Sequence, residues 1–283
     1  MKISVKLITH ALFSAALILT AALPARAEVN DSDLGIHLRG ALGGGRVYLG
    51  YVSYGNSTGD VGAGPGATLN AAAMLSYMFI GVEGNMLVGT IGDLEWKDEE
   101  SGTEYTFTST GSGVYSILDL KLGFNLFREK GDMGYTFIYA GPRLWTMKRN
   151  QDSLKKGSIE VPTNNKYEAH GRGWIVGFRD FSTIGPNDSF AIVLQTGLFG
   201  GKAPVDNFEW SNVPQNLKTD QSLTFGGELA GGIALQNIGL SLVGGFRAEA
   251  NVTSFKDPAA PPDQESAFGL GNVTFFVEAG LQF

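Results

Sequence analysis

The sequence of 283 residues contains no cysteine, and only 17% of its residues are charged. Without cysteine the chain cannot form disulfides, thiolate metal sites or iron–sulfur clusters, and it cannot carry the lipid of a bacterial lipoprotein. A globular domain usually has about 25% charged residues, so this chain has little charge for a protein surrounded by water. Because hydrophobic residues make up 43%, the composition excludes a disordered chain and indicates an apolar surface that faces something other than water.

Glycine is abundant in this sequence, and long helix-forming runs are scarce. The 40 glycines are about 14% of the chain, against an average near 7%, and glycine costs roughly 0.5–1 kcal/mol relative to alanine inside a helix. The two long uncharged stretches of the mature chain, 61–82 and 229–246, are interrupted by glycines. We therefore predict strands in both stretches and no membrane-spanning helix.

Residues 1–27 have the pattern of a secretory signal peptide. Lys2 and Lys6 form a positive start, an apolar run follows, and Ala-Arg-Ala at 25–27 matches a cleavage site, so we expect cleavage before Glu28. The alternative is an uncleaved anchor, but the run is marginal for the ~20 residues that a spanning helix needs. Processing leaves 18 basic against 28 acidic residues, a net charge of −10, which argues against nucleic acid as a partner.

The mature chain, 28–283, alternates with a period of two. Leu118, Leu120 and Leu122 alternate with Asp119 and Lys121, which places apolar and polar side chains on opposite faces of a strand. The same alternation recurs at 190–198, 240–247 and 272–283. Water-soluble β-sandwiches also alternate in this way, so the period predicts strands without identifying the solvent.

The spacing of the strands indicates a membrane barrel. We predict ten strands, with eight or twelve as alternatives, at about 34–54, 66–78, 81–96, 113–127, 134–147, 167–181, 189–200, 220–235, 238–250 and 267–283. Short links at 79–80, 128–133, 182–188 and 236–237 alternate with long links at 55–65, 97–112, 148–166, 201–219 and 251–266. An even strand count with short turns at one end and long loops at the other is typical of an outer-membrane barrel. A sheet in hydrocarbon must also close on itself. We therefore predict a single closed, antiparallel, up-and-down transmembrane β-barrel domain with short periplasmic turns and long extracellular loops.

The carboxy-terminal strand carries a resemblance to a known class. It ends in Phe283, with Leu281 two residues before, and it follows a chain that begins with an export signal. Aromatic residues also gather near both ends of the predicted strands, as in interfacial girdles. In these features the chain resembles the Gram-negative outer-membrane β-barrel proteins as a class. That resemblance implies outer-membrane localisation after export through the periplasm, and a final strand, marked by Leu281 and Phe283, that the barrel-assembly machinery reads.

The polar strand faces predict a charged lumen. Assigning them inward collects side chains of both signs, and Arg143 joins them if its strand faces that way. The predicted lumen network is Arg39, Glu83, Asp119, Lys121, Glu168, Arg172, Glu228, Arg247, Glu249 and Glu278. A barrel of about ten strands is far narrower than an open porin, and unpaired charge would be costly there. We expect a mostly occluded lumen and a structural or surface-interaction role, with a narrow pore for small solutes or ions as the alternative.

A hydrolase is the second alternative. Glu168 and His170 lie two residues apart, so they share a strand face, and a carboxylate at that spacing can orient an imidazole for base chemistry. The pair resembles the acid-x-His pair of the omptin proteases. Omptins set this pair against two aspartates on the opposite wall, whereas the nearest analogue here, at Glu83, is expected near the periplasmic end.

Lipid deacylation would need a serine next to a histidine. The mature chain has only His37 and His170, and no serine is adjacent to either in sequence, although Ser116, Ser189 and Ser241 could approach in space. We therefore assign no catalytic residue, with Glu168 and His170 as weak candidates, and we expect no metal site and no cofactor.

The predicted loop 148–166 is basic. A cationic surface above the membrane could bind the phosphates of lipopolysaccharide, although such runs are often only solvated loop. The candidate contacts are Lys148, Arg149, Lys155, Lys156 and Lys166. The expected partners are thus outer-membrane lipid and lipopolysaccharide, and the sequence leaves the oligomeric state open.

Overall fold

The computed structural model describes most of the chain from residue 34 to residue 282. The described residues are 34–53, 56–75, 78–91, 94–98, 102–127, 134–187, 189–210, 213–215, 218–256 and 266–282. The expected signal peptide at 1–27 and the terminal Phe283 lie outside these residues. No helix within the described ranges is long and apolar enough to cross a membrane.

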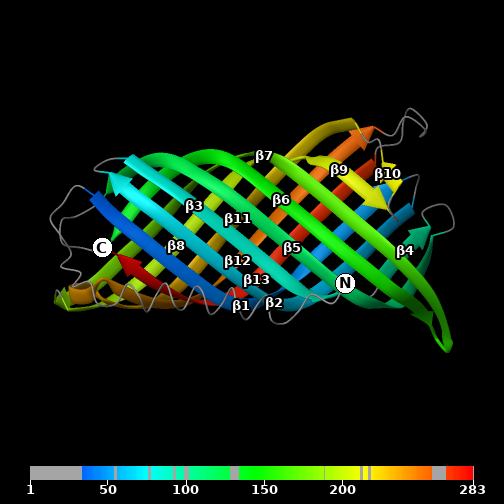
Figure 1. Ribbon diagram of the computed structural model, residues 1–283, viewed down its shortest axis with the longest axis horizontal. Helices are drawn as coiled ribbons and strands as arrows, with labels where there is room; N and C mark the ends of the chain where they lie inside the picture. Colours follow the sequence, from blue (N-terminus) through cyan, green and yellow to red (C-terminus); the bar gives the residue numbers. More distant parts are fainter. Residues whose placement is uncertain are drawn as a thin grey trace.

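Ten long strands form a closed antiparallel barrel (Figure 1). They follow one another around the ring in chain order, as β1 (Leu34–Ser53), β2 (Asn56–Leu75), β3 (Met78–Thr90), β5 (Thr103–Phe127), β6 (Tyr135–Lys156), β7 (Ile159–Asn187), β8 (Phe190–Lys202), β11 (Lys218–Leu235), β12 (Leu240–Lys256) and β13 (Ser266–Gln282). β1 closes the ring on β13, with a register that runs from His37–Gln282 to Val52–Ala267. The predicted all-β, up-and-down barrel of ten strands is therefore confirmed.

The two ends of the barrel differ. We call the end that holds the start of β1 and the end of β13 the terminal end, where a 3₁₀ turn at Gln236–Ile238 joins β11 to β12. We call the opposite end the hairpin end, because β6 and β7 extend there into a projecting hairpin (Figure 1). Three short strands, β4 (Leu94–Asp98), β9 (Val205–Trp210) and β10 (Val213–Gln215), also lie at the hairpin end and pair with the long strands or with each other.

The expected long loops are wrong in four places. β2 already begins at Asn56, β5 begins at Thr103, and β9 and β10 lie within 201–219. The basic segment 148–166 is almost entirely strand, because β6 continues to Lys156 and β7 starts at Ile159. These polar stretches looked like loops, but neighbouring strands supply their backbone hydrogen bonds, so the sheet continues past its apolar part. In the fifth link, 251–266, β12 continues to Lys256 and the part from 257 to 265 lies outside the described residues.

The glycine run in β1 is part of a continuous strand. A β-carbon at Gly43 would collide with the carbonyl oxygen of Phe275 on β13, and one at Gly45 would press on Val273. Only glycine allows the two backbones to approach this closely. The run therefore marks the seam at which the first and last strands close the barrel.

The alternation places apolar side chains outside and polar ones inside. On β5 Leu120 and Leu122 are 46% and 58% exposed. Asp119 and Lys121, which alternate with them along the strand, are 1% and 2% exposed. We call the outward apolar side chains around the barrel the apolar belt; it includes Ile36, Leu42, Leu69, Ile80, Leu118, Leu120, Leu122, Phe124, Ile138, Leu144, Trp174, Val176, Ile192, Leu198, Phe225, Leu229, Leu242, Phe246, Phe275 and Val277. Exposed apolar surface of this extent suits a lipid environment.

Two apolar clusters line the bore, one toward each end. The cluster at the terminal end contains Phe79, Tyr135, Phe137, Tyr139, Ile175, Phe181, Val193, Ala230, Ala234 and Val243. The cluster at the hairpin end contains Leu87, Tyr115, Ile117, Trp145, Met147, Ala169, Ala203, Val205, Phe255, Phe268 and Leu270. Ring stacking orders the first cluster, since Phe79 and Phe137 stack at 4.0 Å and Tyr135 and Phe181 at 5.3 Å between centroids. The buried ion pairs of the bore lie between these two clusters.

Candidate functional site

A layer of ten ionisable side chains crosses the middle of the bore, and we call it the ion-pair layer. Its cations are Arg39, Lys121, Arg143, Arg179 and Arg247, and its carboxylates are Glu83, Asp119, Glu228, Glu249 and Glu278. Each side chain is at most 9% exposed. With five charges of each sign, the layer has no formal net charge.

Glu83 on β3 is the hub of this layer. Lys121 Nζ lies 2.7 Å and Arg179 Nη2 lies 2.9 Å from its Oε2, and Arg247 binds its other oxygen. Asn70 on the neighbouring strand β2 also donates to Oε2 at 3.0 Å. Four partners from four strands therefore converge on one carboxylate and tie opposite walls of the barrel together.

Arg143 on β6 forms the second connection. Its guanidinium makes a two-pronged contact with Asp119, with distances of 2.7 Å and 2.8 Å, and its Nη1 reaches Glu249 at 3.0 Å. Asn272 donates to the other oxygen of Glu249 at 2.9 Å. Charge-assisted, bidentate bonds of this kind are the strong members of a polar network, so this group locks β5, β6, β12 and β13 in place.

Arg39 holds the side of the layer nearest the terminal end. Its Nη1 donates to Gln195 at 2.7 Å and lies 3.3 Å from Glu278, and its Nη2 binds the Tyr135 hydroxyl. Gln195 in turn donates to Glu228 at 3.1 Å. Arg39 also lies 4.4 Å above the centre of the Phe181 ring. The layer is thus joined directly to the apolar cluster at the terminal end.

The sequence placed most of the layer in the bore, but not all of it. Eight of the ten residues expected there are in the layer, and Arg143 joins them. Glu168 and Arg172 are corrections, because even-numbered residues of β7 face outward here; the Arg172 side chain is 77% exposed. Arg179 and Gln195 were missed. β7 is apolar on both faces around Trp174, so its sequence alone does not show which face is inside.

The outer wall of β6 and β7 carries a second polar group, which we call the outer-wall cluster: Thr146, Lys148, Glu168 and His170. His170 Nε2 lies 2.7 Å from Glu168 Oε1, and Lys148 Nζ lies 2.6 Å from the same oxygen. Thr146 Oγ1 lies 3.3 Å from His170 Nδ1. The two weak catalytic candidates therefore do contact each other, but outside the bore, while Glu83 lies in the ion-pair layer and does not face them.

The expected lipopolysaccharide contacts divide between the two faces. Lys148, Lys155, Lys156 and Lys166 are exposed on the projecting hairpin or just below it. Arg149 is a correction, because its side chain is only 9% exposed and lies on the inner face, 5.5 Å from the centre of the Tyr167 ring. Within the described ranges, no group of three or more histidine, aspartate or glutamate side chains could hold a metal ion.

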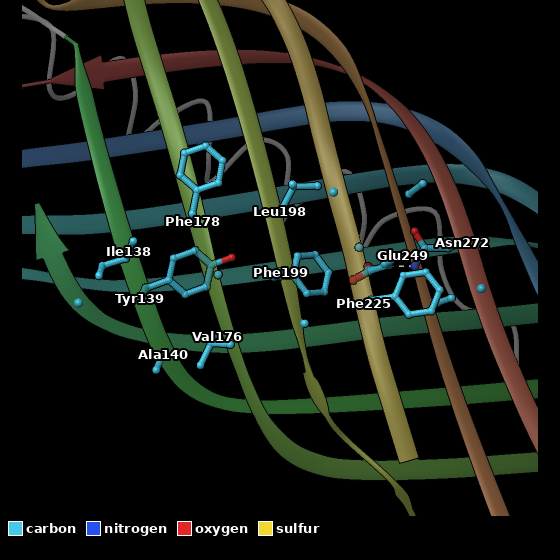
Figure 2. Close-up of a pocket in the computed structure, with 18 of the residues that line it drawn as sticks. Ile138, Tyr139, Ala140, Val176, Phe178, Leu198, Phe199, Phe225, Glu249 and Asn272 are labelled. Carbon is cyan, nitrogen blue, oxygen red and sulfur yellow. Dashed lines mark hydrogen bonds between the residues drawn. The ribbon is translucent and has the colours of Figure 1, made fainter. Parts of the chain in front are cut away.

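One hollow has a rim of outward-facing apolar side chains, and the inward-facing Tyr139, Glu249 and Asn272 also line it. It measures about 1140 Å³, and Figure 2 shows Ile138, Val176, Leu198 and Phe225 among its lining side chains. These four are exposed members of the apolar belt. Gly200, Gly227 and Gly271 add no side chains to its floor. We call it the outer groove, and its outward-facing rim is apolar and suited to acyl chains.

No protein-family model and no curated protein matches this sequence. Solved structures are similar in fold. The outer-membrane protease OmpT from Escherichia coli has a TM-score of 0.55 and 11% identity, over 88% of this chain and 96% of that one. The outer-membrane protein OprG from Pseudomonas aeruginosa gives 0.40 and 8%, over 88% and 95%, and the Pseudomonas putida toluene transporter TodX gives 0.30 and 12%, over 87% and 89%.

Proposed function

We propose that the protein is a closed outer-membrane barrel with a structural or surface-interaction role. Its fold is that of a Gram-negative outer-membrane β-barrel, as the similarity to OmpT shows. The ion-pair layer is the observation that supports the closed bore, because every cation in it contacts a carboxylate of the layer. In this proposal the chain is exported by its 1–27 signal, the assembly machinery reads Leu281 and Phe283, and the terminal end faces the periplasm.

A narrow pore for solutes or ions is the alternative, and the charges do not favour it. A selective pore usually presents an excess of one sign at its constriction, whereas the ion-pair layer balances five cations with five carboxylates. Water would also have to pass two apolar clusters, one on each side of the layer.

Planar-bilayer recording tests the closed bore. We expect purified wild-type protein to show no discrete conductance steps, because ion pairs between opposite walls cross the bore at the layer. The Arg143→Ala variant removes a side chain that touches both Asp119 and Glu249, so it should raise the frequency of openings, whereas Lys155→Gln on the hairpin should leave the bilayer silent. Regular steps from the wild type would contradict the proposal and favour the pore.

We further propose that the hairpin lysines contact lipopolysaccharide. Lys155, Lys156 and Lys166 are exposed, and a lysine ammonium binds phosphate as a point charge. Replacing all three with glutamine should lower the amount of lipopolysaccharide that co-purifies with the refolded barrel, and added salt should have the same effect on the wild type. Equal amounts of bound lipopolysaccharide in both proteins would refute this contact.

A further inference from the structure

The outer-wall cluster contains the three chemical groups of a hydrolytic triad in the right order. Thr146 on β6 and His170 on β7 are directly opposite in the strand register, and Glu168 lies two residues from His170 on the same face. The hydroxyl lies 3.3 Å from Nδ1 of the imidazole, and the carboxylate lies 2.7 Å from Nε2. Hydroxyl, imidazole and carboxylate in hydrogen-bonded sequence are the parts that nucleophilic acyl transfer requires.

The hydrogen bonds also settle which imidazole nitrogen can act as the base. An ionised carboxylate only accepts hydrogen bonds, and Glu168 is held in that form by the Lys148 ammonium at 2.6 Å. In the neutral imidazole, which is the form that can act as a base, Nε2 of His170 therefore carries the proton that it shares with Glu168. Nδ1 is left as an acceptor, and it faces the hydroxyl of Thr146.

The position of the cluster identifies the side from which a substrate comes. The side chains of His170 and Glu168 are 40% and 33% exposed, and they lie on the outer wall, so the bore gives no access to them. One register step toward the terminal end on the same wall, Leu118 of β5 pairs with Leu144 of β6, and both belong to the apolar belt. The cluster thus lies where the belt ends, and in a bilayer the ester bonds of lipids lie between the acyl chains and the headgroups at this boundary.

Charge near the cluster favours an anionic lipid. Lys148 is 58% exposed on one side of His170, and Arg172, which pairs with Asp206 at 2.8 Å, is 77% exposed on the other. Cationic groups beside an acyl-transfer site can bind a headgroup phosphate and stabilise the negative oxygen that forms during the reaction. Ile138, Ala140 and Val176, which line the outer groove, are on the outer wall of the same two strands and offer an apolar surface for acyl chains.

We propose that Thr146, His170 and Glu168 hydrolyse an acyl ester of an anionic outer-leaflet lipid. Thr146 Oγ1 attacks the ester carbonyl carbon, and its proton passes to Nδ1 of His170. The bond between that carbon and the alkoxy oxygen then breaks, and the alcohol leaves with the proton from His170. Water attacks the acyl-threonine through the same imidazole, which releases the fatty acid and restores the hydroxyl. Glu168 is a positioning residue that orients His170.

The test uses the full mature chain refolded in detergent and phosphatidylglycerol as the probe lipid, with released fatty acid as the readout. We expect release by the wild type and a loss of about 100-fold or more in both Thr146→Val and His170→Asn, the range expected when a general base is removed. Glu168→Gln should lower kcat with little change in KM, because it orients the base without touching lipid. In an acid-quenched wild-type reaction, mass spectrometry should find the acyl group on Thr146.

Thr136→Val is the matched control. Thr136 is also on the outer wall of β6 and bonds a carboxylate, Asp180, at 2.5 Å, but no imidazole is part of that contact. We expect this variant to keep full release, and a heat-modifiability gel to show a closed barrel for every variant. The proposal would be overturned if the folded wild type released no fatty acid, or if folded Thr146→Val still released it. A loss of fatty-acid release in Ser116→Ala but not in Thr146→Val would also overturn it. The activity does not depend on the closed bore, which the bilayer recordings test separately.

Discussion

Replacing Glu83 with alanine is expected to destabilise the barrel by about 3–5 kcal/mol, the range seen when one partner of a buried ion pair is removed. The substitution leaves Lys121, Arg179 and Arg247 with one carboxylate fewer in a layer that has no surplus of negative charge. Glu83 is 2% exposed and apolar clusters lie on both sides of the layer, so little water can take the place of its carboxylate. Urea unfolding of the refolded protein in detergent, followed by gel mobility, measures the change.

Two further variants show that the effect comes from the charge of Glu83. Glu83→Gln keeps the shape of the side chain, so most of the loss should persist in it. Glu160→Gln removes a carboxylate from the exposed hairpin, where Ser153 donates to it at 2.8 Å, and should change stability by less than about 1 kcal/mol. If Glu83→Ala unfolds at the same urea concentration as the wild type, the ion-pair layer does not hold the walls together.

Much of the fold could be predicted because a lipid-facing barrel repeats one simple pattern. On β5 every second residue from Leu118 to Leu126 is apolar, so both the strand and its outward face follow from local sequence. Strand ends were harder. At the hairpin end the chain becomes polar while remaining paired, as in β6 up to Lys156, and local composition cannot distinguish a paired polar strand from a loop.

The site was predictable in its residue types but less so in its geometry. Eight lumen residues were predicted from the alternation of polar and apolar residues. The sequence does not show which face of β7 is inside, because this strand has apolar residues on both faces. Glu168 and Arg172 were therefore predicted on the wrong face. The contact of Thr146 with His170 depends on the register between β6 and β7. That register is a long-range property of the hairpin, and register shifts near Gln151 alter it further along the strands. A single sequence contains no local signal for it.

The inner and outer faces of this barrel therefore have different roles. The ion-pair layer and the two apolar clusters on the inner face stabilise the barrel. The ion pairs of the layer join side chains from strands on opposite walls. The outer-wall cluster lies where the belt ends, and the exposed hairpin lysines lie at the hairpin end. We therefore propose that function lies on the outer wall of the barrel. This proposal requires that the apolar belt faces lipid.

Changing Leu122 to arginine tests the lipid-facing belt directly. Leu122 is 58% exposed and lies within the belt on β5. If lipid surrounds it, a charge there should cost about 2–4 kcal/mol in the folding free energy measured in lipid vesicles. Val161 on the hairpin is 53% exposed, so Val161→Arg is a control of similar exposure outside the belt, with an expected cost near zero. A barrel surrounded by water would tolerate both substitutions equally, and equal urea midpoints for the two variants would show that the belt does not face the hydrocarbon of a membrane.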